Sequence, residues 1–287
     1  MTFITRFAPS PTGLLHLGHA YSALLAFDAA KAESGRFLLR IEDIDQGRAR
    51  AEYEDAIYED LAWLGVAWEE PVRRQSAHFS DYDAVLEKLR HMGLVYRCFK
   101  TRKEIADEIA RAPHLPASGP EGPPYVGEAP AAHEEQALLA EGAAYAWRLS
   151  MKAAREKLGA TFDEMTFTEE GRGPNGETGV IQATPEVFGD PVIARKDSGT
   201  SYHLASVHDD AADNITHIIR GEDLFFATHL HRLLQTLTGA PAPVYRHHRL
   251  ITDETGKRFA KRDRSVTLRA LRQAGKSAGD IRRRLGL

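Results

Sequence analysis

The stretch that decides the fold runs from Thr2 to Asp45 and reads TFITRFAPSPTGLLHLGHAYSALLAFDAAKAESGRFLLRIEDID. Alternating apolar residues over 2–8 predict a short strand, which the prolines and glycine after it end. Apolar residues over 17–29 recur at helical spacing, and Gly35 stands where a helix C-cap is expected. Residues 36–42 predict a second strand that is covered on both faces. Together these elements predict a parallel crossover unit.

Two loops of this stretch carry candidate ligand-binding residues. Ligands of parallel sheets bind beyond the carboxyl ends of the strands, and residues 9–16 and 42–45 both follow strands at that edge. His16 and His19 stand at the start of the first helix, where backbone N–H groups and the helix dipole favour anions. Gly18 between them leaves room for a flat base or ribose. This pattern predicts a site for nucleotide phosphates.

The sequence after this stretch predicts helices over 48–65 and 78–93, and its composition then changes. Residues 112–130 contain six prolines, which suits an exposed insertion. The strand and helix rhythm returns after Val192, with strands at 201–207 and 215–220 and a helix at 225–237. We therefore expect a first catalytic half at 1–97, an inserted subdomain with a proline-rich segment at 98–190, a second catalytic half at 191–250, and a loop with basic helical segments at 251–287.

Composition limits the compartment and the partners. The 287 residues are 43% hydrophobic and include one cysteine, Cys98, which excludes an internal disulfide and suits a reducing compartment. The N-terminus has no apolar stretch of the kind that a signal peptide or membrane span requires, so a cytoplasmic protein without membrane contact is expected. The net charge of -4 hides an asymmetry, because residues 257–287 hold eleven basic and two acidic side chains. Such a basic end suits either a phosphate backbone or a solvated surface helix.

Three motifs in their order along the chain resemble the glutamyl and glutaminyl branch of the class I aminoacyl-tRNA synthetases. They are Arg6-Phe7-Ala8-Pro9-Ser10-Pro11-Thr12-Gly13, His16-Leu17-Gly18-His19, and Leu39-Arg40-Ile41-Glu42-Asp43-Ile44-Asp45. Lys257-Arg258-Phe259-Ala260-Lys261-Arg262 resembles the mobile lysine loop of the same class, although Phe259 and Ala260 depart from its commonest form. The resemblance implies an α/β fold with a Rossmann-like nucleotide-binding domain and a parallel sheet, interrupted by a smaller α+β insertion domain.

The resemblance also implies the substrates, which are L-glutamate and ATP with Mg²⁺. Glutamate carries two carboxylates and one ammonium, so its pocket needs two cationic or multi-donor groups and one carboxylate. Residues of those types match the motifs of the glutamate enzymes, including the block around Tyr202 and Arg220. The expected glutamate-binding residues are Arg6, Phe7, Ala8, Pro9, Ser10, Glu42, Tyr202 and Arg220. The expected ATP-binding residues are His16, Gly18, His19 and Lys261, of which His16, His19 and Lys261 are also expected to act in catalysis.

The position of the last residue, Leu287, indicates which members of the family this sequence resembles most. Full-length glutamyl-tRNA synthetases continue with an anticodon-binding domain, so this chain resembles their truncated paralogues, the glutamyl-queuosine tRNA(Asp) synthetases. This family activates glutamate without tRNA and transfers it to queuosine at the wobble position of tRNA(Asp), and a monomer is expected. The alternatives are acylation of the 3' end of tRNA(Glu), nucleotidyl transfer to a small metabolite, and a tRNA-binding module without catalysis.

One departure concerns a metal. Many members of this paralogue family hold zinc through three cysteines and a tyrosine. Here Cys98 and Tyr125 match two of those positions, but Lys100 and Ala129 occupy the other two. One thiolate and one phenol are too few for a structural zinc, which takes four ligands. We therefore expect no structural zinc.

Overall fold

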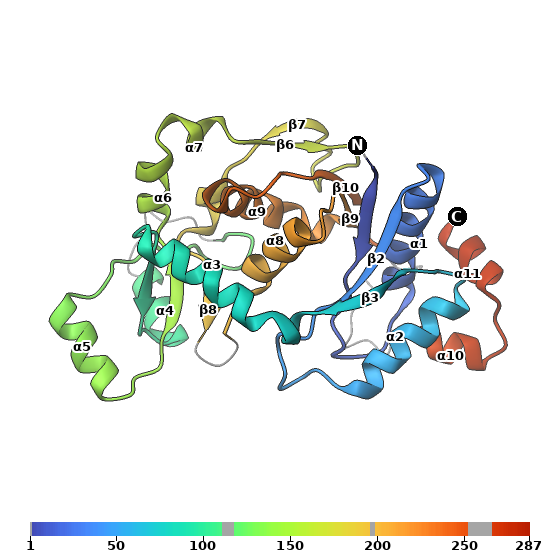
Figure 1. Ribbon diagram of the computed structural model, residues 1–287, viewed down its shortest axis with the longest axis horizontal. Coiled ribbons are helices and arrows are strands. Elements are labelled where there is room, and N and C mark those ends of the chain that lie inside the picture. The colour runs from blue at the N-terminus through green and yellow to red at the C-terminus, as the bar shows by residue number, and fades with distance from the viewer. Residues whose placement is uncertain (1, 111–117, 196–198, 252–265) are drawn as a thin grey trace.

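The structure, a computed structural model, describes residues 2–110, 118–195, 199–251 and 266–287. Three parallel strands form its N-terminal sheet in the order β1-β2-β3, and two helices connect them (Figure 1). This confirms the crossover unit that the first motif predicts. The elements are β1 (Ile4–Phe7), α1 (Leu17–Ala32), β2 (Arg36–Ile41), α2 (Ala51–Trp63) and β3 (Glu69–Arg74).

The end of α1 differs from the prediction. Glu33 is the C-cap, and Ser34 rather than Gly35 follows it with a positive φ of 49°. Gly35 serves a different purpose, since a Cβ atom at this position would lie 2.3 Å from the carbonyl oxygen of Phe3. Only a glycine lets the start of β2 approach the chain before β1 this closely.

A second sheet of four strands, in the order β7-β6-β10-β9, stands beside the first. β9 (His217–Gly221) and β10 (Val244–His248) are parallel, and α9 (Phe225–Thr238) connects them, which confirms the predicted strand and helix. The two sheets meet where β9 lies beside β1. Thr216 joins them, because its N–H donates to the carbonyl oxygen of Ile4 at 2.9 Å and its hydroxyl accepts from the N–H of Ile4 at 2.8 Å.

The segment predicted to be an inserted subdomain contributes to two sheets. An antiparallel sheet of order β4-β5-β8 lies at the far end of the molecule from α1 (Figure 1). The hairpin of β6 and β7 instead extends the second sheet, since β6 pairs with β10. The four-part division of the chain stays a prediction. The elements from β4 to β8 are β4 (Val95–Cys98), α4 (Arg102–Ala110), α5 (Ala132–Ala140), β5 (Ala146–Leu149), α6 (Met151–Leu158), α7 (Ala160–Glu164), β6 (Thr166–Glu169), β7 (Gly179–Gln182), η2 (Pro185–Phe188) and β8 (Val192–Arg195).

The strand predicted over residues 201–207 is wrong, because helix α8 (Tyr202–Ala212) begins there. The hydroxyl of Ser201 caps the helix by accepting from the N–H of Leu204. Almost every residue of α8 up to Asp210 is buried, so the apolar pattern has no helical period that could reveal it. α8 packs between α9 and α3 (Phe79–His91), which η1 (Gln75–His78) precedes, and η3 (Glu222–Leu224) precedes α9.

The basic C-terminal segment forms two short helices, α10 (Leu268–Gln273) and α11 (Ala278–Leu285), which lie beside α1 and α2 (Figure 1). Four apolar side chains of these two helices are buried in the hydrophobic core cluster that also contains residues of α1. Two arginines also face this contact, since Arg282 forms a bidentate pair with Asp28 and Arg272 pairs with Glu59. The predicted helical character of this end is therefore confirmed over these residues. The buried side chains are Leu268, Leu271, Ile281 and Leu285.

Candidate active site

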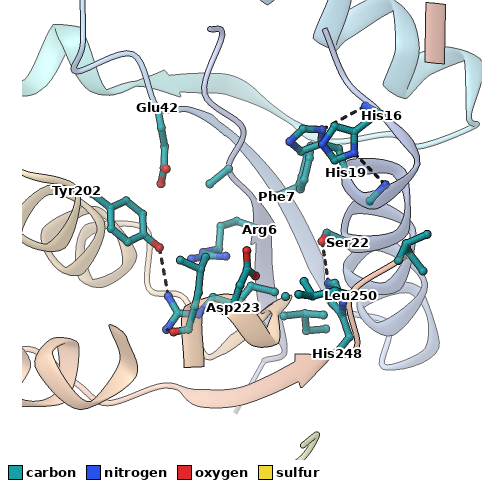
Figure 2. Close-up of a pocket in the computed structure, with 17 residues that line it drawn as sticks. Arg6, Phe7, His16, His19, Ser22, Glu42, Tyr202, Asp223, His248 and Leu250 are labelled. Atoms are coloured by element: carbon teal, nitrogen blue, oxygen red, sulfur yellow. Dashed lines mark hydrogen bonds between the residues drawn. The ribbon is translucent and has the colours of Figure 1, made fainter. Parts of the chain in front are cut away.

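A cavity of about 440 Å³ opens at the carboxyl ends of β1 and β9, beside the start of α1. Glu42 and Tyr202 lie on one side of it, His16 and His19 lie on the other, and Arg6 lies between them (Figure 2). Both motif loops therefore reach one cavity. The lining residues are Arg6, Phe7, Ala8, His16, Gly18, His19, Ser22, Glu42, Tyr202, Ile219, Arg220, Gly221, Asp223, Leu224, His248, Leu250 and Ile251.

The two histidines of the first motif cap helix α1. His16 Nδ1 accepts from the N–H of Gly18 at 3.1 Å, and His19 Nδ1 accepts from the N–H of His16 at 3.2 Å. Because backbone N–H groups occupy both Nδ1 atoms, the proton of each neutral ring lies on Nε2. Gly18 also lets the His16 ring fold back, since a Cβ atom there would lie 3.0 Å from Cε1 of that ring. The helix start therefore presents two oriented imidazoles.

Ser22 and His248 complete this side of the cavity, and neither was predicted. Ser22 Oγ lies 2.7 Å from His248 Nε2, while His248 Nδ1 donates to the carbonyl oxygen of Arg249 at 2.9 Å. The serine hydroxyl must therefore donate to Nε2. The sequence contains an indication of each residue's place in the site. Ser22 lies one helical turn beyond His19, and His248 ends strand β10 at the edge of the sheet where ligands bind.

A buried charge network supports the opposite side. Asp210 accepts from Arg6 Nε at 2.9 Å, from Arg6 Nη2 at 3.3 Å and from Arg40 Nη1 at 2.8 Å. Burial alone would raise the pKa of Asp210, but the two guanidiniums outweigh it and lower the pKa to about 2. Asp210 therefore carries a full charge and holds Arg6 in place. Sequence reasoning missed it, because two adjacent acids near the end of a helix are more often solvent-exposed, and only the fold brings Asp210 to Arg6 and Arg40.

Glu42 follows strand β2, and it is the carboxylate of the motif Leu39-Arg40-Ile41-Glu42-Asp43-Ile44-Asp45 that lines the cavity. It accepts from Arg40 Nη2 and from the hydroxyl of Ser206, both at 3.3 Å. Burial raises its pKa and the neighbouring guanidiniums of Arg40 and Arg6 oppose that rise. An incoming ammonium would find a desolvated carboxylate here, where ion pairing is strongest.

Arg220 is buried with only 5% of its surface exposed, and all its hydrogen-bond partners are uncharged. Its Nε donates to His247 Nε2, its Nη1 to the Tyr202 hydroxyl (Figure 2), and its Nη2 to Thr228 and the carbonyl oxygen of Leu224. No ion pair joins it to a carboxylate among the described residues. A buried guanidinium without an anion is costly, and an anionic ligand would offset that cost.

Nine of the twelve predicted site residues line the cavity together. Pro9 and Ser10 are absent from its wall, although Pro9 accepts from the N–H of Glu42 and so ties the loop to β2. Lys261 lies outside the described residues. The nine residues are Arg6, Phe7, Ala8, His16, Gly18, His19, Glu42, Tyr202 and Arg220.

The described residues hold no group of three or more side chains suited to a metal ion. Cys98 is buried beside Tyr125, and the ammonium of Lys100 lies 5.7 Å from the centre of the Tyr125 ring while it pairs with Glu108. A cation at this position disfavours a second cation such as zinc, but the absence of zinc stays a prediction. No helix in the described ranges is long and apolar enough to cross a membrane.

Comparison with known proteins identifies the family. The profile described as "tRNA synthetases class I (E and Q), catalytic domain" matches residues 2–285. A glutamyl-Q tRNA(Asp) synthetase of Rhodobacter capsulatus is 47% identical over 99% of this chain and all of that protein. Another, from Nitratidesulfovibrio vulgaris, is 39% identical over 96% of this chain and 83% of that protein.

A solved structure agrees. The glutamate tRNA ligase of Elizabethkingia meningosepticum, in complex with its amino acid, superposes with a TM-score of 0.73 at 31% identity. The match covers 92% of this chain and 52% of that one, so the chain spans about half the length of this ligase. The chain belongs to the class I glutamyl- and glutaminyl-tRNA synthetase family and has the fold of its catalytic domain.

Proposed function

We propose that this enzyme uses ATP to activate L-glutamate as glutamyl-adenylate without tRNA, and then transfers the glutamate to queuosine at the wobble position of tRNA(Asp). The observation that carries the first step is Arg220, a buried guanidinium with uncharged partners on the wall of the cavity that His16 and His19 also line. The second step is supported by the relatives of similar length, which are named glutamyl-Q tRNA(Asp) synthetases.

The charges of the pocket match those of glutamate. Arg220, with the Tyr202 hydroxyl beside it, would bind one carboxylate through its planar fork. Glu42 would bind the ammonium. Arg6 uses two nitrogens for Asp210, and its Nη1 makes no hydrogen bond with a described residue, so it can orient the other carboxylate between the two halves of the pocket. Phe7 and Ala8 also line the cavity.

Activation would proceed by in-line attack. The α-carboxylate of glutamate attacks the α-phosphorus of ATP, and pyrophosphate leaves with its magnesium ion. His16 and His19, together with the start of α1, would offset charge on the phosphates, and Lys261 of the lysine loop is expected to add an ammonium. A ring hydroxyl of queuosine then attacks the mixed anhydride and releases AMP. The leaving phosphate is good enough that no protein base is assigned.

The tRNA would contact the basic end of the chain. Arg283 and Arg284 are exposed on α11, and Lys276 is exposed on the turn before it. A phosphate backbone bound there would release counterions, so transfer should weaken as salt rises. We also propose that the enzyme is a monomer and that it is cytoplasmic, the latter because its single buried cysteine suits a reducing compartment.

The function is tested with labelled glutamate. Exchange of pyrophosphate into ATP should depend on glutamate and should not need tRNA. Label should then appear on tRNA(Asp) that carries queuosine and not on tRNA(Asp) that lacks it. Label found only at the 3' end of tRNA(Glu) would favour the alternative acylation, and ATP turnover without glutamate dependence would favour nucleotidyl transfer to another metabolite.

A further inference from the structure

A buried pair of side chains lies directly behind Arg220. His247, on β10, accepts from Arg220 Nε through its Nε2 at 3.1 Å. On the other side of the ring, His247 Nδ1 lies 2.5 Å from the carboxylate oxygen Oε2 of Glu169. The side chains of His247 and Glu169 have no exposed surface, so water cannot replace either contact.

The proton on His247 is placed by its two neighbours. A guanidinium N–H can only donate, so Nε2 must be an unprotonated acceptor. The ring proton therefore lies on Nδ1, from which it is donated to Glu169. Burial lowers the pKa of His247 to about 4, so the ring is neutral at neutral pH. The series of hydrogen bonds that runs from Arg220 through His247 to Glu169 has only one arrangement in which every donor meets an acceptor.

Glu169 is itself held in one orientation. Its other oxygen, Oε1, accepts from the backbone N–H of His247 at 2.8 Å and from that of Gly171 at 2.7 Å. Glu169 ends strand β6, and β6 pairs with β10 at Tyr245. The hairpin of β6 and β7 thus delivers a carboxylate to the back of the amino-acid pocket, 78 residues before the histidine that it contacts.

We propose that Glu169 is a positioning residue for the amino-acid pocket. By keeping the His247 proton on Nδ1, it leaves Nε2 as the acceptor that orients the guanidinium of Arg220 toward the substrate carboxylate. This inference rests on the proposed glutamate activation. Glu169 lies behind His247 and does not line the cavity, so its effect on the substrate passes through the ring.

The structure predicts an unusual outcome for the isosteric change Glu169→Gln. The two backbone N–H groups at Oε1 fix the amide oxygen there, so the amide NH2 of the glutamine faces His247 Nδ1. The ring proton must then move to Nε2, where it opposes the N–H of Arg220. A change of one atom, with no change in volume, would turn a hydrogen bond to Arg220 into a contact between two donors.

The test measures glutamate-dependent exchange of pyrophosphate into ATP. E169Q should raise the KM for glutamate about tenfold or more while the KM for ATP stays within twofold. The matched control is E170Q, because Glu170 is the next residue, is exposed and pairs with Arg246 on the surface. It should leave both constants unchanged. An E169Q enzyme with an unchanged KM for glutamate, or with both KM values raised alike, would overturn the proposal.

A second substitution, at His247, distinguishes two effects of E169Q. One is the effect passed through the hydrogen bonds from residue 169 through His247 to Arg220, here called the relay, and the other is the general loss of a buried charge. In H247L no polar side chain connects residue 169 to Arg220, so the residue at 169 can no longer set the acceptor that faces the guanidinium. E169Q should therefore raise the KM for glutamate at least tenfold in the native background and less than twofold in the H247L background. An equal effect in both backgrounds would show a structural role only and would refute the relay.

Nuclear magnetic resonance of the imidazole nitrogens reads the tautomer without any activity. The His247 signal, assigned by its loss in H247L, should report a protonated Nδ1 in the native protein and a protonated Nε2 in E169Q. The same tautomer in both would overturn the inference even if exchange is observed. Absence of glutamate-dependent exchange in the native enzyme would instead refute the proposed function, while a tautomer change in E169Q would still support the relay.

Discussion

Replacement of Asp210 by asparagine should destabilise the protein strongly. The carboxylate of Asp210 accepts three hydrogen bonds from two guanidiniums. All three residues are buried, since Asp210 and Arg6 are each 5% exposed and Arg40 is 1% exposed. Asparagine removes the charge and turns one acceptor atom into a donor that faces a donor. Breaking a buried pair in this way costs about 3–5 kcal/mol, because it leaves charge uncompensated in the interior.

The assay is thermal unfolding followed by circular dichroism. At roughly 2–4 °C per kcal/mol, a loss of about 3 kcal/mol lowers the Tm by about 6–12 °C. Since Arg6 lines the cavity, the KM for glutamate should rise as well. D163N is the control, because Asp163 pairs with Arg155 at the exposed surface, where such pairs contribute about 0–1 kcal/mol. A D210N protein that unfolds within 2 °C of the native protein would refute the claim that this network holds the site together.

The pH dependence of stability follows from the same carboxylate. Its pKa of about 2 lies below the ordinary value near 3.8, so the ionised form contributes about 2 kcal/mol above pH 4, and this is lost as pH falls toward 2. The difference in the free energy of unfolding between native and D210N protein, measured in urea, should therefore shrink by about 2 kcal/mol over that range. Arg220→Lys keeps the charge but loses the fork, and it should raise the KM for glutamate about 100-fold with the KM for ATP unchanged in the exchange assay. His19→Asn should lower kcat of exchange about 100-fold and leave the KM for glutamate within threefold, as expected for a group that acts on the phosphates. Charge reversal of Arg283 and Arg284 to Glu should weaken glutamate transfer to tRNA about tenfold, with the exchange rate intact.

The sequence predicted the parts of the fold and site that depend on local pattern. The strand, helix and strand of residues 2–45 follow from periodicity and turn residues, and the two histidines follow from their place at the helix start. The residues of helix α8 predict a strand because both faces of the helix are buried, which removes the period that distinguishes a helix from a strand.

The supporting residues could not be predicted, because their contacts span long separations in the chain. Asp210 meets Arg6 across 204 positions, and Glu169 meets His247 across 78. Neither acid stands in a motif, and each is recognised only by what it touches. Short patterns mark the groups that face the substrate, whereas the groups that orient them come from topology.

The line where the two sheets meet has a consequence for how the enzyme responds to its substrate. Thr216 supplies the hydrogen bonds at the junction of β1 with β9, near Ile4, while the cavity opens at the other end of the same strands. Arg6 belongs to one sheet and Arg220 to the other. An amino acid bound by both would act as a further noncovalent cross-link beside the buried pairs of Asp210 with Arg6 and Arg40, so saturation with glutamate should make the two halves of the catalytic fold unfold as a single cooperative unit.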